Sequence, residues 1–503
     1  MTAQCLNRRG TIIGVASKVP HTWSIARTLS DGINIETSKS EQSAKITSDD
    51  IDFVCDFVAD EFGDDFELIP FLKNGIGLHH SGLSDETRVL MEWLVERGQL
   101  STLVATTTIA QGVNFPVSGV VLAGHQYPYG QDMPPEDFWN LAGRAGRADQ
   151  TGLGVIALAA STDAKAATLK NYVGRNVADL NSILVTMVAE ALSKGALELQ
   201  TLFHMKEWSA FLQYLAHTYC QIDDHNSFAT QIEQVLRGSF GFQKIRQQNA
   251  ATANALVNAV QRYAGILRGK PLALVDSTGF SWESVSRALA GIREERFTPD
   301  MWEGERLFNT NNSDLARAFG VLFKVPEIRE ELTEAIHGRG PDGDLLARIV
   351  KDWVHGASIP DLATSYFAET SGDKTTAITN ACRSVYGKLI QTASWGLSAL
   401  QSLTIGGAID ELPAGEQRTV RNLPSRVYYG VNTDAAIDLR LLGVPRKAAQ
   451  PLADSFAVKP SSTGGISDVR SRLAQLDPAG WQAALGSKGQ TYRRAWRIIE
   501  GRE

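Results

Sequence analysis

Two arginines spaced three residues apart are the side chains of this sequence best suited to binding phosphate. Arg144 and Arg147 lie in the segment NLAGRAGR, 140–147, on a helix predicted from Pro135 onward. Residues three apart share one face of a helix, so both guanidiniums can reach the same group. Each offers a fork of donors that matches phosphate oxygens, and Gly143 lets a ligand or another backbone approach closely. A surface salt-bridge site is the alternative explanation.

A second segment, 103–117, places hydroxyl groups at the end of a predicted buried strand. The strand ends in three consecutive threonines, Thr106, Thr107 and Thr108. Their hydroxyls and amides can bond phosphate oxygens without reading bases. Gly112 and Asn114 follow on a tight turn that Pro116 locks. Taken alone, the segment is better explained as a Thr-rich strand end before a Pro-stopped turn.

His79 and His80 belong to a third segment, 75–83, which runs off a predicted strand into a helix. Neighbouring strand residues point to opposite faces, so the two rings cannot easily share one ion, and we expect no metal site. We interpret the segment as a structural turn at Ser81 and Gly82, with one histidine directed at a partner or a phosphate.

These segments require a parallel sheet to bring them together. From Arg9 to about Ala160, short apolar runs alternate with amphipathic segments, as a parallel sheet flanked by helices requires. The predicted strands are 11–16, 76–79, 103–107, 119–123 and 154–158. Ser48 and Ser84 are placed to cap two helices, and Gly98 ends the second. Ligands of open α/β sheets sit at the carboxyl edge, where we expect the polar residues to gather.

Beyond the sheet, helical periodicity replaces the strand signals. We predict an α/β domain followed by mostly α-helical domains. The predicted bounds are 1–160 for the α/β domain, 161–240 for a winged-helix-like or helical connector, 241–400 for a helical domain and 401–503 for a C-terminal helical region.

The C-terminal region contains a possible second phosphate site. The stretch 439–452 places a Gly-Val-Pro turn between two helical segments, with Arg446 and Lys447 at the start of the second. It resembles a helix-hairpin-helix, whose turn amides can hold a phosphate. An ordinary helix–helix corner is the alternative.

Composition narrows the class of protein. The chain has 503 residues, 43% hydrophobic and 21% charged, with a net charge of −7, which fits about three domains and excludes a disordered or collagen-like chain. Four scattered cysteines suggest neither a zinc site nor a disulfide framework, and no run of about 20 apolar residues predicts a membrane span. We expect a cytoplasmic protein whose nucleic-acid contacts are confined to a local groove.

In chain order and at this spacing, segments 75–83, 103–117 and 140–147 resemble motifs IVa, V and VI of the second RecA-like lobe of superfamily 2 helicases, closest to the Ski-like DExH group. The opening TIIGVASKVPHTWSIARTL resembles motif IV of the same lobe. The mostly helical part of this chain after residue 160 is consistent with the winged-helix and helical-bundle domains of that group. A narrower resemblance, in motifs V and VI, is to bacterial helicases of defence islands, which implies a defence-system nuclease as a partner.

The resemblance implies two sets of roles. Arg147, with Arg144, would reach the γ-phosphate of ATP as an arginine finger, which is worth roughly 10³ to 10⁵ in rate. Residues implied near the nucleotide are Gly112, Asn114, Asn140, which stands where the family usually has Gln, and Gly143. Residues implied near a single- or double-stranded nucleic acid are His79, His80, Thr106, Thr107 and Thr108.

Half of the expected ATP site has no counterpart in the sequence. No stretch fits GxxxxGKS or GxxxxGKT, and no DExH segment is present. ATP and Mg²⁺ would therefore be bound mainly by a first RecA-like lobe, supplied in cis or in trans, and we expect no ATPase activity from this chain alone. Since the similarity begins near residue 10, we expect no room for that lobe within the sequence.

Three hypotheses remain open. The first is that the chain is the C-terminal portion of an ATP-dependent DNA or RNA helicase. The second is a non-catalytic nucleic-acid-binding or scaffold module that keeps the lobe as a platform. The third is a gene remnant or incomplete gene, whose isolated lobe would expose an apolar face and aggregate.

Overall fold

The structure is a computed structural model, and part of the chain is described in it. The described residues are 10–39, 48–106, 117–122, 124, 126, 133, 138–139, 141, 155–160, 162–173, 183–193, 195, 197–222, 227–337, 339–456 and 465–502.

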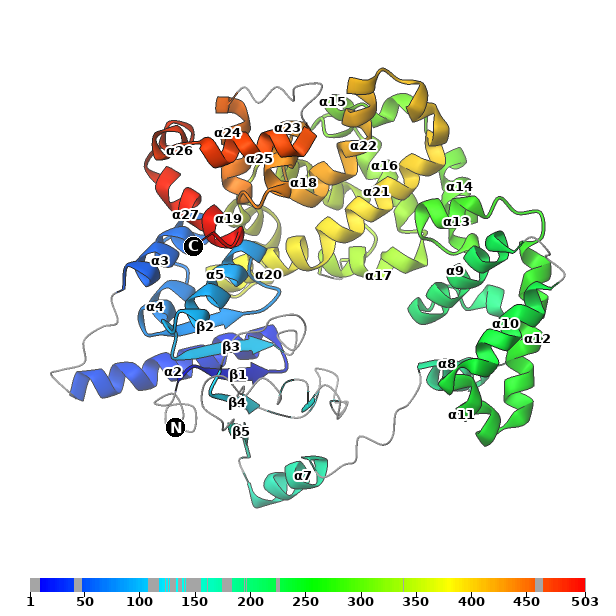
Figure 1. Cartoon of the computed structure of the whole chain (residues 1–503), viewed down its shortest axis with the longest axis horizontal. Helices are drawn as coiled ribbons and strands as arrows, with labels where there is room; N and C mark the ends of the chain where they lie inside the picture. The colour runs from blue at the N-terminus through cyan, green and yellow to red at the C-terminus, as the bar shows by residue number, and fades with distance from the viewer. Residues whose placement is uncertain are drawn as a thin grey trace. The chain divides into compact units, whose positions relative to one another are not determined.

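Five parallel strands form one sheet in the order β2-β3-β1-β4-β5 (Figure 1). Their bounds are β1 Ile12–Ala16, β2 Ile76–His79, β3 Thr102–Thr106, β4 Gly119–Leu122 and β5 Val155–Leu158. The predicted α/β fold with a parallel sheet is therefore confirmed, and each strand begins and ends within one residue of its predicted bounds. The prediction succeeds because parallel strands buried on both faces read as continuous apolar runs.

Helices lie between and after the strands, and two of them, α3 and α5, begin where the sequence predicts. Their bounds are α2 Val19–Lys39, α3 Asp49–Phe62, α4 Leu68–Lys73, α5 Asp85–Glu96 and α7 Asp163–Val173. The hydroxyl of Ser48 accepts from the backbone N–H of Ile51, and that of Ser84 from the N–H of Thr87, so both predicted caps are confirmed. Gly98 follows α5 with φ +67°, the left-handed conformation that glycine adopts most readily.

The described chain forms two compact units, each built from separated segments. The first unit joins Met1–Ala178 with His355–Gly387 and Tyr429–Glu503, and the second joins Asp179–Val354 with Lys388–Tyr428. The consecutive domains 161–240, 241–400 and 401–503 remain predictions. They are continuous stretches of sequence, whereas each compact unit joins separated stretches. Sequence patterns give no sign that the last segment packs on the sheet-bearing unit.

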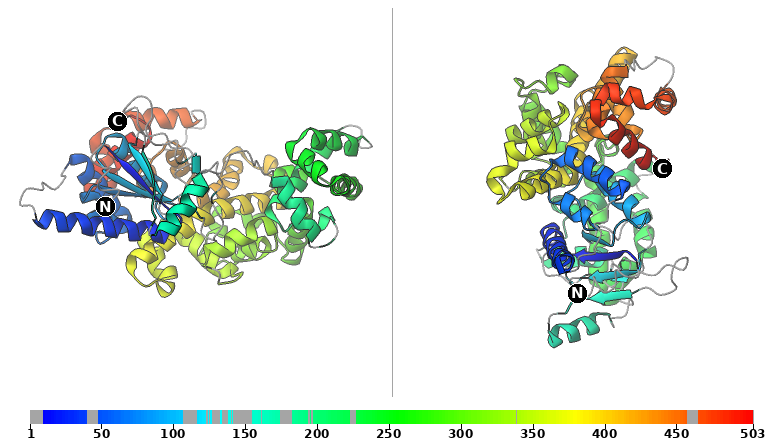
Figure 2. Two further views of the ribbon diagram at one scale, coloured as in Figure 1. Left: turned by 90° about the horizontal axis from the view of Figure 1, so that it is seen from below. Right: turned by 90° about the vertical axis from the view of Figure 1, so that its left-hand side faces the viewer.

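Short helices of the returning segments complete the first unit. Their bounds are α19 Ile359–Leu362, α20 Lys374–Ser384, α23 Asp434–Leu441, α24 Arg446–Phe456, α25 Gly465–Gln475, α26 Pro478–Leu485 and α27 Gly489–Ile499. The last of these, α27, packs on α3 and α5, and both views in Figure 2 show the red C-terminal helices beside the blue α3.

The second unit contains helices and turns, with no strand among its described residues. Its helices are α8 Ile183–Ser193, α9 Lys206–Gln221, α10 Phe228–Gly238, α11 Phe240–Gln248, α12 Ala250–Leu267, α13 Ala273–Thr278, α14 Trp282–Glu294, α15 Gly304–Leu307, α16 Asp314–Leu322, α17 Pro326–Ala335, α18 Gly343–Val354, α21 Ile390–Thr404 and α22 Ala414–Tyr429. Trp208 on α9 is fully buried in the core of this unit.

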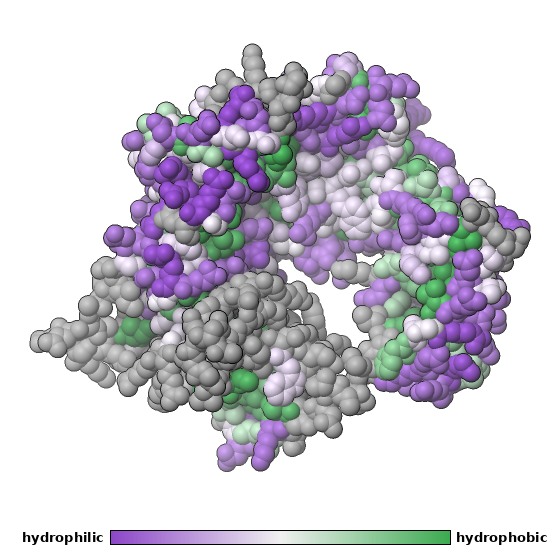
Figure 3. All heavy atoms as spheres, in the orientation of Figure 1, coloured by the Kyte–Doolittle hydropathy of each residue, from purple (hydrophilic) through white to green (hydrophobic). Residues whose placement is uncertain are grey.

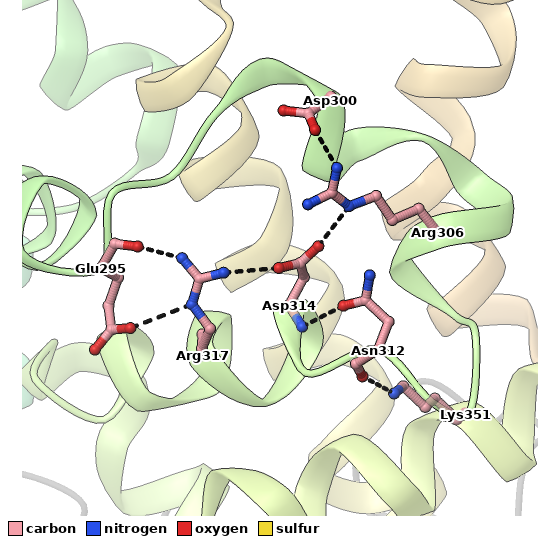
Figure 4. A network of polar contacts seen from close by, with 7 residues as sticks. All are labelled: Glu295, Asp300, Arg306, Asn312, Asp314, Arg317 and Lys351. Atoms are coloured by element: carbon pink, nitrogen blue, oxygen red, sulfur yellow. Dashed lines mark hydrogen bonds and ion pairs between the residues drawn. The ribbon is translucent and has the colours of Figure 1, made fainter.

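A buried carboxylate organises one corner of the second unit (Figure 4). The side chain of Asp314 is 4% exposed, and its oxygens accept from Nε of Arg306 at 2.8 Å and Nη1 of Arg317 at 2.7 Å. Arg306 also pairs with Asp300, and Arg317 with Glu295. Two guanidiniums offset the desolvation of the buried carboxylate, so we assign the cluster a structural role.

Candidate functional site

The carboxyl ends of β2, β3 and β1 lie side by side on one edge of the sheet. The Cα of His79 pairs with that of Ala105, and the Cα of Thr106 pairs with that of Ala16. Two of the three polar segments singled out in the sequence thus leave the sheet from neighbouring strands. This edge is where ligands of open α/β sheets bind.

Thr106 is the last residue of β3 and is buried, at 7% exposure. Most of the other predicted site residues lie outside the described residues, so their roles stay predictions. They are Thr107, Thr108, Gly112, Asn114, Asn140, Gly143, Arg144 and Arg147.

The helix predicted from Pro135 onward is partly described. Phe138, Trp139 and Leu141 are helical and come just before Arg144 and Arg147 in the sequence. Phe138 and Leu141 are buried, whereas Trp139 is 44% exposed. Burial three residues apart with an exposed residue between them fits an amphipathic helix at this point of the chain.

His79 ends β2 and is held by a hydrogen-bond partner from the following helix. Its Nε2 lies 2.7 Å from Oε1 of Glu92 on α5, and the residue is only 5% exposed. Among the described residues, its Nδ1 atom has no hydrogen-bond partner. Its contact with a nucleic acid stays a prediction, and in this structure the ring is anchored to its own domain.

His80 holds the turn between β2 and α5. The ring is fully buried, and its Nδ1 accepts from the backbone N–H of Gly82 at 3.0 Å, so the remaining ring hydrogen is on Nε2. The backbone N–H of Leu83 donates to the carbonyl of His80 at 3.1 Å, which closes the turn. Burial, followed by nearby charge on His79 and Arg383, lowers the pKa of His80 to about 3. The ring therefore stays neutral at physiological pH.

A structural turn at Ser81 and Gly82 was the favoured interpretation of this segment, and the hydrogen bonds of His80 agree with it. A Cβ at Gly82 would lie 2.8 Å from Cγ2 of Thr379 on α20. The turn is therefore closely packed against a segment that follows it by almost three hundred residues. Within the described ranges, no group of three His, Cys, Asp or Glu side chains could hold a metal ion.

Three residues that the sequence analysis did not single out lie at the end of the central strand. Ser17 and Lys18 follow β1, and His21 lies in the first turn of α2 with its Nδ1 3.4 Å from Oγ of Ser17. Lys18 and His21 are exposed, and the first turn of α2 has no acidic residue, in contrast to α3 and α5. An exposed lysine at a helix start without carboxylates suits an anion. The sequence signal that could have identified these residues is a Ser-Lys pair directly after a buried strand.

The helix-hairpin-helix-like turn is engaged in internal contacts. Arg446 is 7% exposed, and its guanidinium donates to the carbonyls of Gly430 at 2.9 Å and Ala357 at 3.0 Å. Lys447 donates to the backbone carbonyl of Asp60 and lies 3.3 Å from its carboxylate. The two bases are therefore committed to partners within the unit.

The turn itself is covered by the last helix. Gly443 has φ +76°, and a Cβ there would lie 3.2 Å from a carboxylate oxygen of Glu500. Nε1 of Trp496 donates to the carbonyl of Leu442 at 2.9 Å. A carboxylate beside the turn opposes an anion, so these contacts favour the ordinary helix–helix corner over a phosphate site.

A buried ion pair fastens this corner to the sheet-bearing domain. Arg440 on α23 donates to Oε1 of Glu86 on α5 at 2.5 Å, with side chains 15% and 8% exposed. Burial acts to raise the pKa of Glu86, but the charge and hydrogen bond of Arg440 offset it and leave that pKa lowered. The pair is therefore ionised, and α23 is anchored to the first turn of α5.

The comparisons with known proteins place the chain in a class. No protein-family model matches it. Curated relatives with 31% to 40% identity over part of the chain show a relationship to helicases. Within the described ranges, no helix has the length and hydropathy that a membrane crossing requires.

Three relatives show how far the similarity extends. The Hachiman protein HamB of Bacillus cereus is 31% identical over 184 residues, 35% of this chain and 16% of HamB. The DExH-box ATP-dependent RNA helicase DExH14 of Arabidopsis thaliana is 35% identical over 122 residues, 23% of this chain and 5% of the relative. The human activating signal cointegrator 1 complex subunit 3 is 40% identical over 92 residues, 17% and 4% of the two chains. The chain thus spans a small share of each relative.

Proposed function

We propose that this chain supplies the second RecA-like lobe and the following helical domains of an ATP-dependent DNA or RNA helicase. One observation carries the proposal. His79 and Thr106, from two of the three motif-like segments, end neighbouring strands of a parallel sheet in a chain whose relatives include a named ATP-dependent RNA helicase. A sheet edge that binds nucleic acid beside a nucleotide cleft requires polar residues at the ends of neighbouring parallel strands.

In this proposal the chain completes an ATP site that begins elsewhere. Arg147 and Arg144 stabilise charge on the γ-phosphate, as an arginine finger does. Gly112, Asn114, Asn140 and Gly143 line the nucleotide side of the lobe. ATP and Mg²⁺ are bound mainly by a first lobe, in the same polypeptide or in a separate one, because the sequence has no phosphate-binding loop.

The nucleic acid lies along the carboxyl edge of β2, β3 and β1. Thr106, Thr107 and Thr108 contact its sugar-phosphate backbone, which carries little base information. We add Lys18 and His21 to this path because both are exposed at the end of the central strand. His79 and His80 act by holding the turn beside the path, since both rings are buried.

A non-catalytic scaffold that binds nucleic acid is the second candidate. The absence of a phosphate-binding loop and of a DExH segment from the sequence favours it. A defence-system nuclease would be a partner under either candidate. The scaffold differs from the helicase in one respect, because its role would not depend on the two arginines.

The test replaces Arg147 by Ala in the chain combined with the first lobe encoded upstream or beside it. We expect ATP turnover stimulated by single-stranded nucleic acid to fall by roughly 10³-fold or more, because the finger acts on the transferring phosphoryl group. Replacement of the exposed Arg293 by Ala is the matched control and should leave turnover unchanged. Turnover or a cellular role that survives Arg144→Ala with Arg147→Ala would favour the scaffold.

A further inference from the structure

The segment 234–275 of the second unit is positively charged and has no carboxylate. Its six basic residues are Arg237, Lys244, Arg246, Arg262, Arg268 and Lys270. The whole chain has 56 Asp and Glu in 503 residues, so a stretch of this length would contain about five at the average density. The charge of this segment is therefore opposite in sign to the net charge of the chain, −7.

The structure places this segment on α11, α12 and the end of α10. These helices pack on one another. Asn249 lies between α11 and α12 and caps α12, because its Oδ1 accepts from the N–H of Ala251 at 2.9 Å. One side of α12 supplies core side chains, which are Leu256, Val260, Tyr263 and Leu267. Because these side chains pack in the core, the opposite side of α12 faces solvent.

The exposed side of α12 is a stripe of amides that ends in a guanidinium. The exposed residues in the stripe are Asn254, Asn258, Gln261, Gly265 and Arg268. Their alternating spacing of four and three residues keeps them on one face. No side chain lies within 4 Å of a Cβ built at Gly265, so the middle of the stripe is open. Figure 3 shows a largely hydrophilic surface over α11 and α12, on the right of the view.

Two cations of this surface are available to a ligand. Arg246 at the end of α11 and Arg268 after α12 are exposed, and in the part of the chain that the structure describes neither has a hydrogen-bond or ion-pair partner. By contrast, Arg237 is paired with Glu233, and Arg262 donates to the carbonyl of Leu197 at 3.0 Å.

Carboxylates near this surface come only from neighbouring elements of the described chain. They are Glu190 on α8, Glu198 before the turn Leu199–Thr201, Glu207 on α9, Glu233 on α10, Asp276 directly after the segment and Glu283 on α14. Glu283 lies on the core side of α12, where its Oε2 accepts from the hydroxyl of Tyr263 at 3.1 Å. The face of α12 from Asn254 to Arg268 has none. An anion that lies along this face therefore meets donors and no charge of its own sign.

Asn, Gln and Arg side chains are the donors that proteins use toward phosphate and sugar oxygens. The stripe contains 15 residues, whose 14 steps of 1.5 Å extend about 21 Å and cover several successive phosphates of a helical strand. A platform for single strands would need several aromatic rings for bases to stack on, and this surface exposes one, Phe240. The chemistry therefore suits a duplex, whose bases are already stacked inside.

We propose that α11 and α12 form a docking surface for the phosphodiester backbone of a nucleic-acid duplex, contacted by Arg246, Arg268 and the amides between them. This surface is separate from the sheet edge and extends the proposed function, on which it rests for the presence of a duplex. It would hold the base-paired part of a substrate without reading its sequence.

The experiment compares two double charge reversals in the full chain. The test variant carries Arg246→Glu and Arg268→Glu. The control carries Arg293→Glu and Arg329→Glu, which reverse two exposed arginines that lie beside carboxylates on α14 and α17. Binding of a fluorescent 20-base-pair duplex and of one of its strands is measured by anisotropy at several salt concentrations.

For the test variant we expect duplex affinity to fall about tenfold or more. We also expect the slope of log affinity against log salt to become shallower by about 2, since each phosphate contact contributes about 0.9. The control should bind as the parent does. Unchanged duplex affinity and slope in the test variant would overturn the proposal, and so would a loss confined to the single strand.

The outcomes also separate this inference from the proposed function. If the charge reversal leaves duplex binding unchanged while ATP turnover still depends on Arg147, only the docking surface is wrong. If the parent chain binds no nucleic acid at all, both the surface and the helicase assignment are wrong.

Discussion

The hydroxyl of Tyr492 donates a hydrogen bond of 2.5 Å to Oδ2 of Asp60, across 432 residues of sequence. The same hydroxyl lies 3.2 Å from Oε1 of Glu61. Through this contact α27, the last helix, is bonded to the end of α3 beside the sheet. The sheet-bearing domain is therefore completed by the end of the chain, and its stability depends on that contact.

Replacement of Tyr492 by Phe tests that dependence. It removes a hydrogen bond to a carboxylate and should lower the free energy of unfolding by about 1.5 to 3 kcal/mol. Urea denaturation followed by fluorescence measures the change. Tyr214→Phe, at a tyrosine that is 43% exposed, is the control and should change stability by less than about 0.5 kcal/mol. Equal effects of the two substitutions would contradict the structural role.

Glu61 predicts a pH dependence of stability. Burial raises its pKa from 4.5 to about 7, with the charge of Glu86 adding to the shift. The folded state thus holds this proton more tightly than the unfolded state, so the stabilisation is present below pH 4.5 and is lost as the pH rises to about 7.

Glu61→Gln should remove that loss, since an amide does not titrate. We expect the variant to gain on the order of 3 kcal/mol over the parent between pH 4.5 and pH 8, measured as the difference between their free energies of unfolding. Groups whose pKa is lowered act in the opposite direction, and one that is not coupled to Glu61, such as Asp50, cancels in this difference. A difference that stays constant with pH would refute the assignment.

The buried pair of Glu86 and Arg440 predicts a strongly non-additive double-mutant cycle. Glu86→Leu or Arg440→Met alone leaves one charge buried without its partner and should cost about 3 to 5 kcal/mol. The double variant should be less destabilised than either single one. Thermal or urea unfolding of all four proteins gives the coupling, and additive losses would show that the pair is not formed.

Gly82→Ala tests the packing of the turn that His80 holds. The new methyl would lie 2.8 Å from Cγ2 of Thr379 and 3.0 Å from Nδ1 of His80, so we expect a loss of about 1 to 3 kcal/mol. Thr379→Ser removes the nearer obstacle and should restore part of the stability in the double variant. No restoration would mean that the contact with α20 is not formed in solution.

Local sequence signals predicted the sheet because they act over a few residues. Buried runs such as Thr102–Thr106 fixed the strands, and Ser48 and Ser84 fixed two helix starts through side-chain bonds three residues away. The register that brings the ends of β2 and β3 together follows from the parallel order of the strands.

Contacts across long sequence separations could not be read in this way. Arg446 and Lys447 were candidates for phosphate because they begin a helix after a tight turn. Nothing near them in the sequence reveals that the ammonium group of Lys447 donates to the carboxylate of Asp60, 387 residues earlier. In the same way, no local signal indicates that the ring of His79 contacts Glu92 and that the ring of His80 accepts from the backbone of Gly82.

The central claim is that this chain supplies one half of an ATP site. Its most direct test is ATP turnover by the purified chain with saturating single-stranded nucleic acid, measured with and without the first lobe of the same system. We predict no turnover above background for the chain alone, and turnover that appears with the first lobe and disappears with Arg147→Ala. Robust turnover by the chain alone, or turnover with the first lobe that is indifferent to Arg147, would contradict the account.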